Sequence, residues 1–469
     1  METPEVDTVD HESYRDSLAT VDEKGKRIWI YPKKPKGKFY NYRKWVSYFL
    51  LLVLFGLPWI KVNGEPLVLI NILERKFIIF GVHIGTQDFH IMVVAMLILV
   101  VFITLFTVIF GRLFCGWVCP QTIFMEMVYR RIEYWIEGDA NAQRRLNKQD
   151  WDADKVIKKV SKQVIFFLIA VLIANTFLAY IIGTDEVLKI ITEPVSMHLQ
   201  GFLTMLGFSF VFYMVFSQLR EQVCTTICPY GRLQGVLLDK KSLAVYYDFE
   251  RGEPRGRMKK NEDQSNKGDC IDCNLCVQVC PTGIDIRNGV QLECVNCTAC
   301  MDACDEVMTK IKKPTGLIRW ASYEGIVTGV SKIFNSRTIA YSSVLLILIA
   351  LESFLFISRT QVEVLLLRTP GMLFQKQDDG TVSNLYNYQV MNKTDMEVQL
   401  EFRLKNIEGR IEMVGATPST IKHGRVEGAL FIKIDPEELP KTKTKIIVEI
   451  YGDGELLDKS STSFLGPMK

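Results

Sequence analysis

Histidine is scarce in this chain, with five residues among 469, and this scarcity argues against a protein that carries several haems. Neither sign of charge is in large excess. The formal net charge is only +3, so the sequence lacks the global positive field that would indicate a nucleic-acid partner. The first 44 residues contain no long apolar run, and we therefore expect no cleavable signal peptide. Residues 358–469 contain no cysteine, unlike the rest of the chain.

Long apolar runs are abundant, and they indicate a membrane protein. A helix needs about 20 apolar residues to cross a bilayer core. The run at 89–110 has 22 residues of this character. We predict five such spans, at 45–60, 89–110, 164–182, 201–219 and 339–357. The first is short and the fourth is polar at its ends.

The distribution of Lys and Arg predicts the orientation of these spans. Segments 24–44, 111–163 and 218–338 carry nine, ten and seventeen such residues, whereas the loops 61–88 and 183–200 carry three and one. Because Lys and Arg gather in cytoplasmic loops, the N-terminus is predicted inside and the C-terminus outside. All twelve cysteines then lie on the cytoplasmic side or at its membrane edge, where a reducing compartment keeps thiols free for metals.

Eight cysteines form two quartets with one spacing, in the stretches CIDCNLCVQVCP and CVNCTACMDAC. Each quartet reads Cys-x2-Cys-x2-Cys-x3-Cys, which is typical of ferredoxins with two [4Fe-4S] clusters, and the fourth cysteine of each quartet binds the other cluster. Two zinc sites of four cysteines each are the alternative, although zinc ribbons favour separated Cys-x2-Cys pairs. We predict one cluster on Cys270, Cys273, Cys276 and Cys304, and the second on Cys280, Cys294, Cys297 and Cys300.

Two further cysteine pairs, Cys115/Cys119 and Cys224/Cys228, each follow an apolar span and precede a proline. On one continuous helix, residues four apart share a face, so each pair would present two sulfurs side by side. A close dithiol can bind a soft metal or form a disulfide. Because soft thiolates favour Cu(I) over Cu(II), such a site would also make copper reduction more favourable. Small buried cysteines without chemistry are the alternative. The matched pairs also suggest that the two halves of the membrane region are copies of one helix hairpin.

Two histidines, His90 and His198, begin the second and fourth spans at equivalent places. A haem held between them is one interpretation. We favour the other, in which both are polar residues at the membrane interface.

The segment after residue 358 changes from a helical to a strand-like pattern. Stretches such as EVQLEFRL and KTKIIVEIYGDGELL alternate apolar and polar residues between turn signals. About seven short strands in roughly 110 residues predict an antiparallel, immunoglobulin-like β-sandwich. The predicted organisation is a mobile basic arm (1–44), a four-helix transmembrane region with both cysteine pairs (45–245), a polar linker (246–269), a ferredoxin domain (270–313), a connector with the fifth transmembrane helix (314–358) and the sandwich (359–469).

These features together resemble the CcoG family, also called FixG or RdxA, of membrane polyferredoxins associated with assembly of cbb3-type cytochrome oxidase. The basic arm, the spans, the motifs FCGWVCP and VCTTICP, the eight-cysteine repeat and the sandwich carry the resemblance, which covers nearly the whole chain. It implies a protein of the bacterial cytoplasmic (inner) membrane, with a periplasmic sandwich, that takes electrons from a cytoplasmic donor. It further implies reduction of Cu(II) to Cu(I) for the oxidase, with the four paired cysteines as copper-binding and catalytic residues.

Two rival functions stay open at this point. The paired cysteines also occur in quinol-linked membrane ferredoxins of the NapH/NosR type, so the chain resembles an electron-transfer subunit as well, although its β-rich tail favours the CcoG family. In the second rival, the sandwich docks the oxidase and the clusters only sense redox state. The electron donor, the side from which copper arrives and the oligomeric state are not determined by the sequence.

Overall fold

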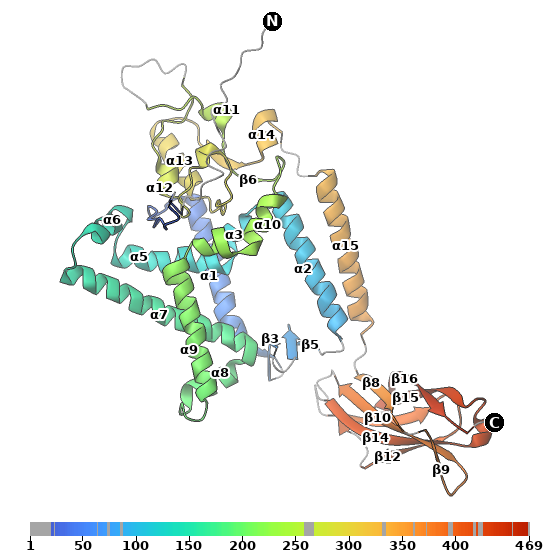
Figure 1. Cartoon of the computed structure of the whole chain (residues 1–469). Helices are drawn as coiled ribbons and strands as arrows, with labels where there is room; N and C mark the ends of the chain where they lie inside the picture. The colour runs from blue at the N-terminus through green and yellow to red at the C-terminus, as the bar shows by residue number, and fades with distance from the viewer. Residues whose placement is uncertain are drawn as a thin grey trace. The chain divides into compact units, whose positions relative to one another are not determined.

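The computed structural model of the chain divides into two compact units (Figure 1). The first holds the ferredoxin segment and the helices up to Ala350, and the second holds the β-sandwich. The described residues are 20–22, 24–62, 64–72, 76–84, 88–257, 267–330, 334–359, 362–371, 373–392, 397–415, 419–420, 425–452 and 454–467. Residues 1–19 of the predicted arm and 258–266 of the predicted linker lie outside this set.

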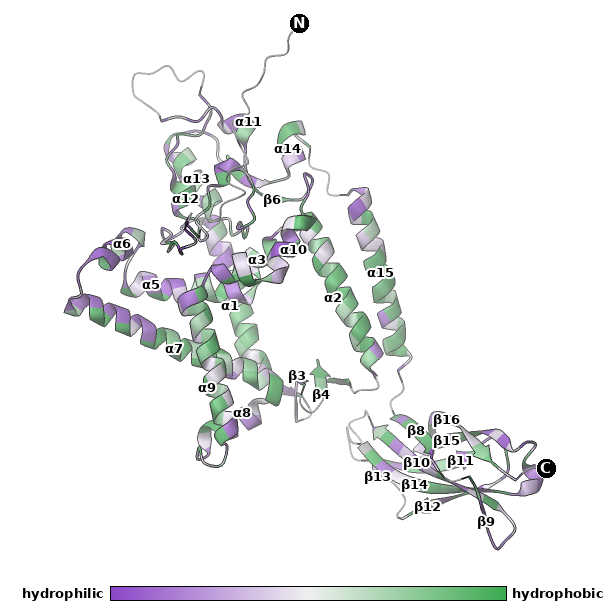
Figure 2. Ribbon diagram, viewed as in Figure 1, coloured by the Kyte–Doolittle hydropathy of each residue, from purple (hydrophilic) through white to green (hydrophobic). Residues whose placement is uncertain are grey.

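Four described helices are long and apolar enough to cross a membrane. They are α2 (Phe89–Phe110), α7 (Ala153–Ile182), α9 (Leu199–Met214) with its π-helical continuation η5 (Val215–Leu219), and α15 (Ser336–Ile357). Apolar residues give α2 and α15 long green stretches in Figure 2. These helices coincide with four of the predicted spans, and they indicate a membrane protein.

The first predicted span, 45–60, differs from the structure. Helix α1 runs from Lys38 to Gly56, and its first half carries Arg43 and Lys44, so only its second half is apolar. The turn η2 (Leu57–Trp59) follows, and Pro58 within it lacks the N–H group that would continue the α-helical hydrogen bonds. Helix α1 is therefore not among the four candidate spans of the described residues.

Short elements connect the long helices. Those between α2 and α7 are α3 (Leu113–Trp117), α4 (Pro120–Ile123), η4 (Phe124–Tyr129), α5 (Arg130–Ile136) and α6 (Ala140–Lys148). Those beyond α7 are α8 (Thr184–Thr192), η6 (Val223–Ile227) and α10 (Pro229–Leu237). The loop between α1 and α2 holds the short strands β1 (Lys61–Val62), β2 (Glu65–Pro66), β3 (Val68–Asn71), β4 (Lys76–Ile79) and β5 (Val82–Ile84).

Aromatic packing and a buried ion pair hold the connector against the spans. Tyr129 stacks on Phe216, with ring centroids 4.6 Å apart, and meets Phe166 edge to face at 4.7 Å. Beside this cluster, the guanidinium of Arg220 donates two hydrogen bonds, of 2.6 and 2.8 Å, to the carboxylate of Glu133. Burial alone would raise the pKa of Glu133, but the Arg220 charge holds it at about 2, so this pair stays charged.

The ferredoxin segment is larger than the predicted 270–313. Strand β6 (Ala244–Tyr247) precedes the two quartets and pairs antiparallel with β7 (Ile318–Ala321), which follows them. The two ends of the ferredoxin segment are thus joined in one small sheet. Its helices are α11 (Phe249–Gly252), α12 (Leu275–Gln278), η7 (Ile286–Asn288), α13 (Ala299–Lys310) and, beyond β7, α14 (Tyr323–Thr328). The start of the predicted linker therefore belongs to the ferredoxin fold.

The described residues of the predicted mobile arm that precede α1, 20–22 and 24–37, form a strap with specific contacts. The Arg27 side chain donates to Glu221 at 2.8 Å, and the Lys33 N–H donates to the Gln278 carbonyl at 2.7 Å. At the end of the strap, the Asp302 carboxylate of α13 accepts from the N–H groups of Phe39 and Tyr40 at 3.1 and 2.7 Å. These bonds connect the strap to the ferredoxin segment and to Glu221, which precedes Cys224. The described part of the arm is therefore held in place, and the expectation of a mobile arm does not apply to it.

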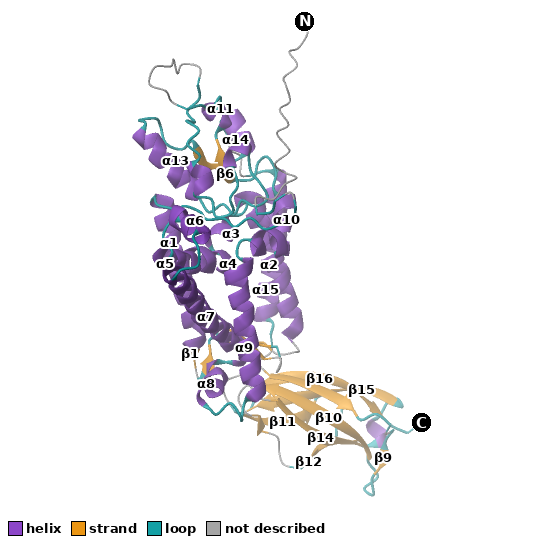
Figure 3. Ribbon diagram, turned by 60° about the vertical axis from the view of Figure 1, so that its left-hand side comes forward, coloured by secondary structure: helices purple, strands orange, loops and turns teal. Residues whose placement is uncertain are grey.

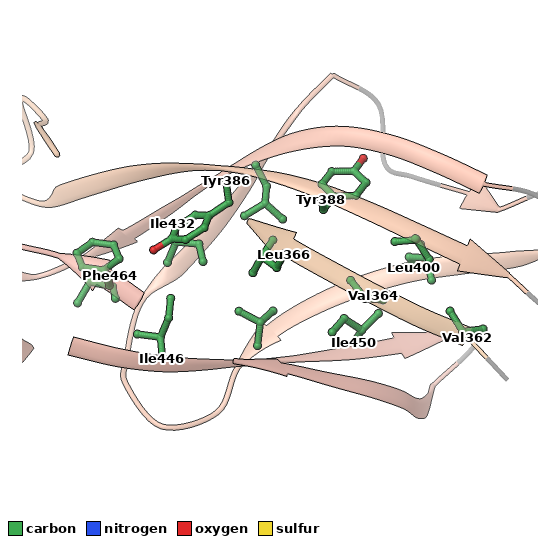
Figure 4. Packing of buried hydrophobic residues seen from close by; sticks show 14 of the residues in the cluster. Val362, Val364, Leu366, Tyr386, Tyr388, Leu400, Ile432, Ile446, Ile450 and Phe464 are labelled. Atoms are coloured by element: carbon green, nitrogen blue, oxygen red, sulfur yellow. The ribbon is translucent and has the colours of Figure 1, made fainter. Parts of the chain in front are cut away.

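The second unit is a two-sheet β-sandwich (Figure 3). One sheet has the order β12–β14–β10–β8 with β9 beside β10, and the other has the order β13–β11–β15–β16. The strands are β8 (Val362–Arg368), β9 (Gln375–Lys376), β10 (Val382–Asn392), β11 (Val398–Leu404), β12 (Arg410–Val414), β13 (Ser419–Thr420), β14 (Arg425–Ile434), β15 (Lys443–Gly452) and β16 (Glu455–Leu465). Alternating side chains of both sheets, including Val364, Tyr386, Ile432 and Phe464, form its core (Figure 4).

Candidate metal centre

The two cysteine quartets adopt one backbone conformation twice. Asp272 and Asn274 have φ values of 53° and 57°, and the equivalent Asn296 and Thr298 have 52° and 64°. Positive φ is rare outside glycine, so its recurrence at the same two places indicates one loop shape used in both quartets. Such a loop folds its thiols toward a common centre, as a cluster requires.

Two cavities lie inside these loops, and the predicted ligand sets line them. The outer cavity is lined by Cys270, Cys273, Cys276 and Cys304. The inner cavity is lined by Cys280, Cys294, Cys297 and Cys300, with Cys276 also on its wall. The structure therefore brings the fourth cysteine of each quartet to the other quartet. The assignment of each thiolate to iron is part of the proposal below.

The chemistry of these cavities fits iron–sulfur clusters. Burial raises the pKa of Cys276, Cys294 and Cys304 to about 12, so the thiolates form at neutral pH only beside a compensating cation such as iron. Buried donors fit as well, because cluster sulfurs accept hydrogen bonds. Arg43 Nη2 and Arg112 Nε are both buried and have no hydrogen-bond partner among the described residues.

Chemical analysis tests the cluster count. We expect anaerobically purified protein to hold about eight irons and eight acid-labile sulfides per chain, without zinc, because each cavity takes a four-iron cluster. The Cys280→Ser variant should lose the inner cluster, because Cys280 lines the cavity of the second quartet. EPR of the reduced variant would contradict the crossed assignment by showing loss of the outer cluster alone, and a wild-type content of about four irons would contradict the two-cluster assignment.

The paired cysteines outside the ferredoxin segment lie in two loops of one conformation, which we call the rim loops (111–120 and 220–229). Gly111 and Arg220 occupy equivalent positions, with φ and ψ of 57° and −131° in one and 52° and −123° in the other. In each loop the N–H of the second cysteine bonds to the carbonyl five residues before it, Phe114 for Cys119 and Val223 for Cys228. The structure thus repeats the internal symmetry that the sequence suggested.

The predicted continuous helix through each pair is wrong. Cys115 lies in α3, but Cys119 has an extended conformation and precedes α4. Cys228 likewise follows η6 and precedes α10. Proline is the first residue of both following helices, because its fixed φ suits a helix start and its ring clashes with a preceding helical turn. The proline therefore separates each pair from the next helix instead of bending one helix.

The two rim loops interlock, and their four thiols share one region. The Cys115 thiol donates to Gln234 Oε1 of α10 at 3.1 Å. Burial and the nearby Cys119 raise the pKa of Cys115 to about 12. Burial also raises the pKa of Cys224 to about 12, with further increases from Cys119 and Cys115 in the other loop. The thiols of Cys115, Cys119 and Cys224 thus each interact electrostatically with the opposite pair.

The geometry limits how these thiols could hold a metal. Across the described chain, no three His, Cys, Asp or Glu side chains lie close enough together to hold a single ion. Two thiolates are sufficient for Cu(I), which accepts low coordination numbers and favours soft sulfur ligands. The rim loops are therefore compatible with copper on pairs of thiolates.

The first rim loop packs directly on the inner cavity. Cys115 contacts a buried cluster that contains Val295 and Cys297. Gly116 lies so near the loop that a Cβ added there would stand 2.4 Å from the Val295 carbonyl oxygen. The outer cavity contrasts with this arrangement, because Cys273 is exposed to solvent. The ferredoxin segment therefore has one face toward the solvent and one toward the rim thiols.

Several residues of the site carry no signal in the sequence. Arg43 of α1 donates from Nε to the Gly116 carbonyl at 2.6 Å. Arg112 donates to the carbonyls of Leu292 and Gly231. Both look like ordinary basic residues at a membrane edge, and only long-range packing places them between the cysteine loops.

The two histidines lie apart from these loops. His198 Nε2 pairs with the Glu193 carboxylate at 2.5 Å, at the start of α9. His90 lies in the first turn of α2. Haem binding at these residues stays an untested alternative.

Comparison with known sequence families adds an independent observation. Residues 219–323 match a family described as a 4Fe-4S dicluster domain, and residues 92–139 match a 4Fe-4S binding domain. Residues 353–467 match a family described as an Ig-like fold at the C-terminus of FixG. These matches confirm the predicted fold class of a membrane protein with ferredoxin and Ig-like domains.

Relatives match over most of the chain. Protein RdxB of Cereibacter sphaeroides is 34% identical over 78% of this chain and 80% of its own length. The nitrogen fixation protein FixG of Rhizobium meliloti is 37% identical over 67% of this chain and 61% of its own length. A crystal structure of a FixG-related protein from Vibrio parahaemolyticus covers 23% of this chain and 97% of that chain, with 18% identity and a TM-score of 0.19.

Proposed function

The chain belongs to the family of FixG, RdxA and RdxB, membrane iron–sulfur electron-transfer proteins, and from this premise we propose that it reduces Cu(II) to Cu(I) at the rim thiols. The Cu(I) would serve assembly of a cbb3-type cytochrome oxidase. The observation that carries this proposal is the packing of Cys115 and Gly116 against the inner cavity, at Val295 and Cys297. An electron that reaches the second quartet is then next to the thiols that would hold copper.

The cysteines of each cavity would hold one of the two clusters. Cys270, Cys273, Cys276 and Cys304 would hold the outer cluster, and Cys280, Cys294, Cys297 and Cys300 the inner one. When bound, the clusters supply one-electron transfer. The exposed Cys273 marks the place where a cytoplasmic one-electron donor would dock. Per turnover the donor loses one electron and one bound Cu(II) gains it, so the electron-transfer step itself moves no proton.

The rim thiolates favour the product of this reaction. Thiolate sulfur is a soft ligand and binds Cu(I) more strongly than Cu(II), which makes reduction of bound copper more favourable. Partial burial raises the pKa of Cys115 and Cys224, so these thiols carry their protons at neutral pH in the absence of a metal. Copper binding therefore has to displace protons from these thiols.

One observation favours a second candidate function. The 4Fe-4S binding family that matches 92–139 covers only two cysteines of this chain, Cys115 and Cys119. In the alternative, the rim thiols belong to an electron path between the quinone pool and a partner reductase, as in a NapH/NosR-like subunit.

Purified, cluster-loaded protein separates the two candidates. Under anaerobic conditions the same sample is given a one-electron donor with Cu(II), and a reduced quinol with an electron acceptor. Formation of Cu(I), measured with a Cu(I)-specific chelator, supports copper reduction. Quinol oxidation without Cu(I) formation would support the alternative.

The membrane orientation is tested with reporters. We propose that the sandwich lies in the periplasm and the ferredoxin segment in the cytoplasm, because the short loops rich in Lys and Arg flank the ferredoxin side. Alkaline phosphatase fused after residue 469 should be active, and the same enzyme fused after residue 257 should be inactive. A cytoplasmic reporter, β-galactosidase, should give the opposite pattern at both sites. The reversed result would overturn the orientation and the reducing surroundings of the cysteines.

A further inference from the structure

Two buried arginines, Arg43 of α1 and Arg112 of the first rim loop, lie where this rim loop meets the ferredoxin segment. Their exposures are 2% and 4%. Arg43 bonds to the Gly116 carbonyl at 2.6 Å, next to the Val295 and Asn296 backbone, and its charge acts on Cys297. Arg112 bonds to the carbonyls of Leu292 and Gly231, and its charge reaches both Cys294 and Cys115.

Neither arginine forms an ion pair with a carboxylate within the described part of the chain. Two acidic groups interact electrostatically with this region, Glu293 with Arg112 and Glu126 with Cys297. Glu126 pairs with Arg130 at 3.3 Å. The positive charges of Arg43 and Arg112 are therefore incompletely compensated beside the inner cavity.

At the outer cavity, by contrast, the positive charge is paired with carboxylates. Its one lining cation, Arg287, pairs with Asp285 at 2.6 Å and also with Asp272. Asp305 adds a further negative charge near Cys304. The Arg287 guanidinium at the outer cavity is thus neutralised by two carboxylates, whereas Arg43 and Arg112, beside the loop of the second quartet, have no such partner among the described residues.

A cluster becomes more negative by one charge when it accepts an electron. Nearby positive charge stabilises the reduced form, and the stabilisation is large where water is excluded. We propose that Arg43 and Arg112 raise the reduction potential of the inner cluster above that of the outer one. Electrons taken up at Cys273 would then run toward the rim loops and not back. This inference rests on the cluster assignment of the proposed function and is independent of whether copper is the acceptor.

Charge has to be separated from shape in the test, because both arginines also bond to backbone carbonyls. Glutamine variants, Arg43→Gln and Arg112→Gln, remove the charge. Lysine variants, Arg43→Lys and Arg112→Lys, keep the charge and lose the planar fork. Arg319→Gln is the matched control for the inner cluster, because the Arg319 side chain is 47% exposed and pairs with Asp248, and neither residue lines the inner cavity.

The measurement is an anaerobic redox titration followed by EPR, with iron and sulfide counted in every sample. Cys270→Ser and Cys294→Ser identify which signal belongs to which cluster. We expect each glutamine variant to keep its iron and to lower the potential of the inner cluster only. The lysine variants and Arg319→Gln should titrate like the unmodified protein. Unchanged potentials in the glutamine variants would overturn the inference, as would equal shifts in the lysine variants or a shift confined to the outer cluster.

A variant that removes a negative charge tests the same idea if the glutamine variants fail to load their clusters. Glu126 lies near Cys297 and raises its pKa, so Glu126→Gln removes a negative charge without touching either arginine's hydrogen bonds. Its inner cluster should titrate at a higher potential than that of the unmodified protein. No rise in a fully loaded Glu126→Gln sample would overturn the role of local charge.

Discussion

Replacement of Cys115 and Cys119 together by serine is expected to abolish copper binding and Cu(II) reduction and to leave the iron content intact. A hydroxyl is a hard, weak ligand for Cu(I), so the reduced product loses its stabilisation. The ferredoxin cysteines come from a different part of the chain and line their own cavities, so their clusters should persist. Bound copper, Cu(I) formation and iron are measured on one anaerobic preparation.

The second pair offers a matched comparison. Cys224→Ser with Cys228→Ser should behave in the same way, because the thiols of both rim loops influence one another. Thr226→Ala is the control, since Thr226 lies between the two cysteines of that loop and is exposed. If both double variants keep full activity and copper stoichiometry, the four thiols only pack, and the quinol-linked function becomes the better account.

The parts of this molecule that the sequence predicted are those set by local spacing. Apolar length identified four membrane helices, because the bilayer fixes that length. The spacing from Cys270 to Cys304 predicted the crossed cysteine sets that line the two cavities, because few loops can wrap a cluster. Alternating residues predicted the sandwich for a similar reason, since side chains of a strand alternate between its two faces.

The helix expected through each rim pair was wrong because two local sequence preferences conflict there. The four-residue spacing of Cys115 and Cys119 favours one helical face, but the proline after them cannot follow a helical residue without a clash. The chain therefore turns at Cys119, and the sulfurs are positioned by loop geometry. The sequence carried this proline, and its preference for a first helical turn could have predicted the break.

Other features depend on contacts far apart in the chain. Strand β6 pairs with β7 across the whole ferredoxin segment, from Ala244 to Ala321, and neither strand has a distinctive pattern of its own. The strap looked like a mobile basic arm because its charges match a solvated tail. Its fixed position follows from partners such as Glu221 and Gln278, which no local pattern could identify.

The second large effect is expected at Gly116, where the rim meets the ferredoxin segment. A methyl group in Gly116→Ala would stand 2.4 Å from the Val295 carbonyl and 2.9 Å from that of Asn296, which is closer than carbon and oxygen can approach. Both contacts are with backbone, so the two loops have to separate. The electron then has a longer distance to cross between the inner cluster and bound copper, so we expect Cu(II) reduction to slow several-fold.

This variant distinguishes electron transfer between the clusters and copper from copper binding and from cluster reduction. Copper binding should persist because the four rim thiols are unchanged, and the chemical donor should still reduce both clusters. Only electron transfer from the clusters to copper should slow. To measure it, a pre-reduced sample is mixed rapidly with Cu(II), and the absorbance of the clusters is followed. Gly207→Ala in α9 is the control, because a Cβ at Gly207 has no neighbour within 4 Å among the described residues. Equal rates in Gly116→Ala and Gly207→Ala, with full iron in both, would place the path from the clusters to copper somewhere other than this contact.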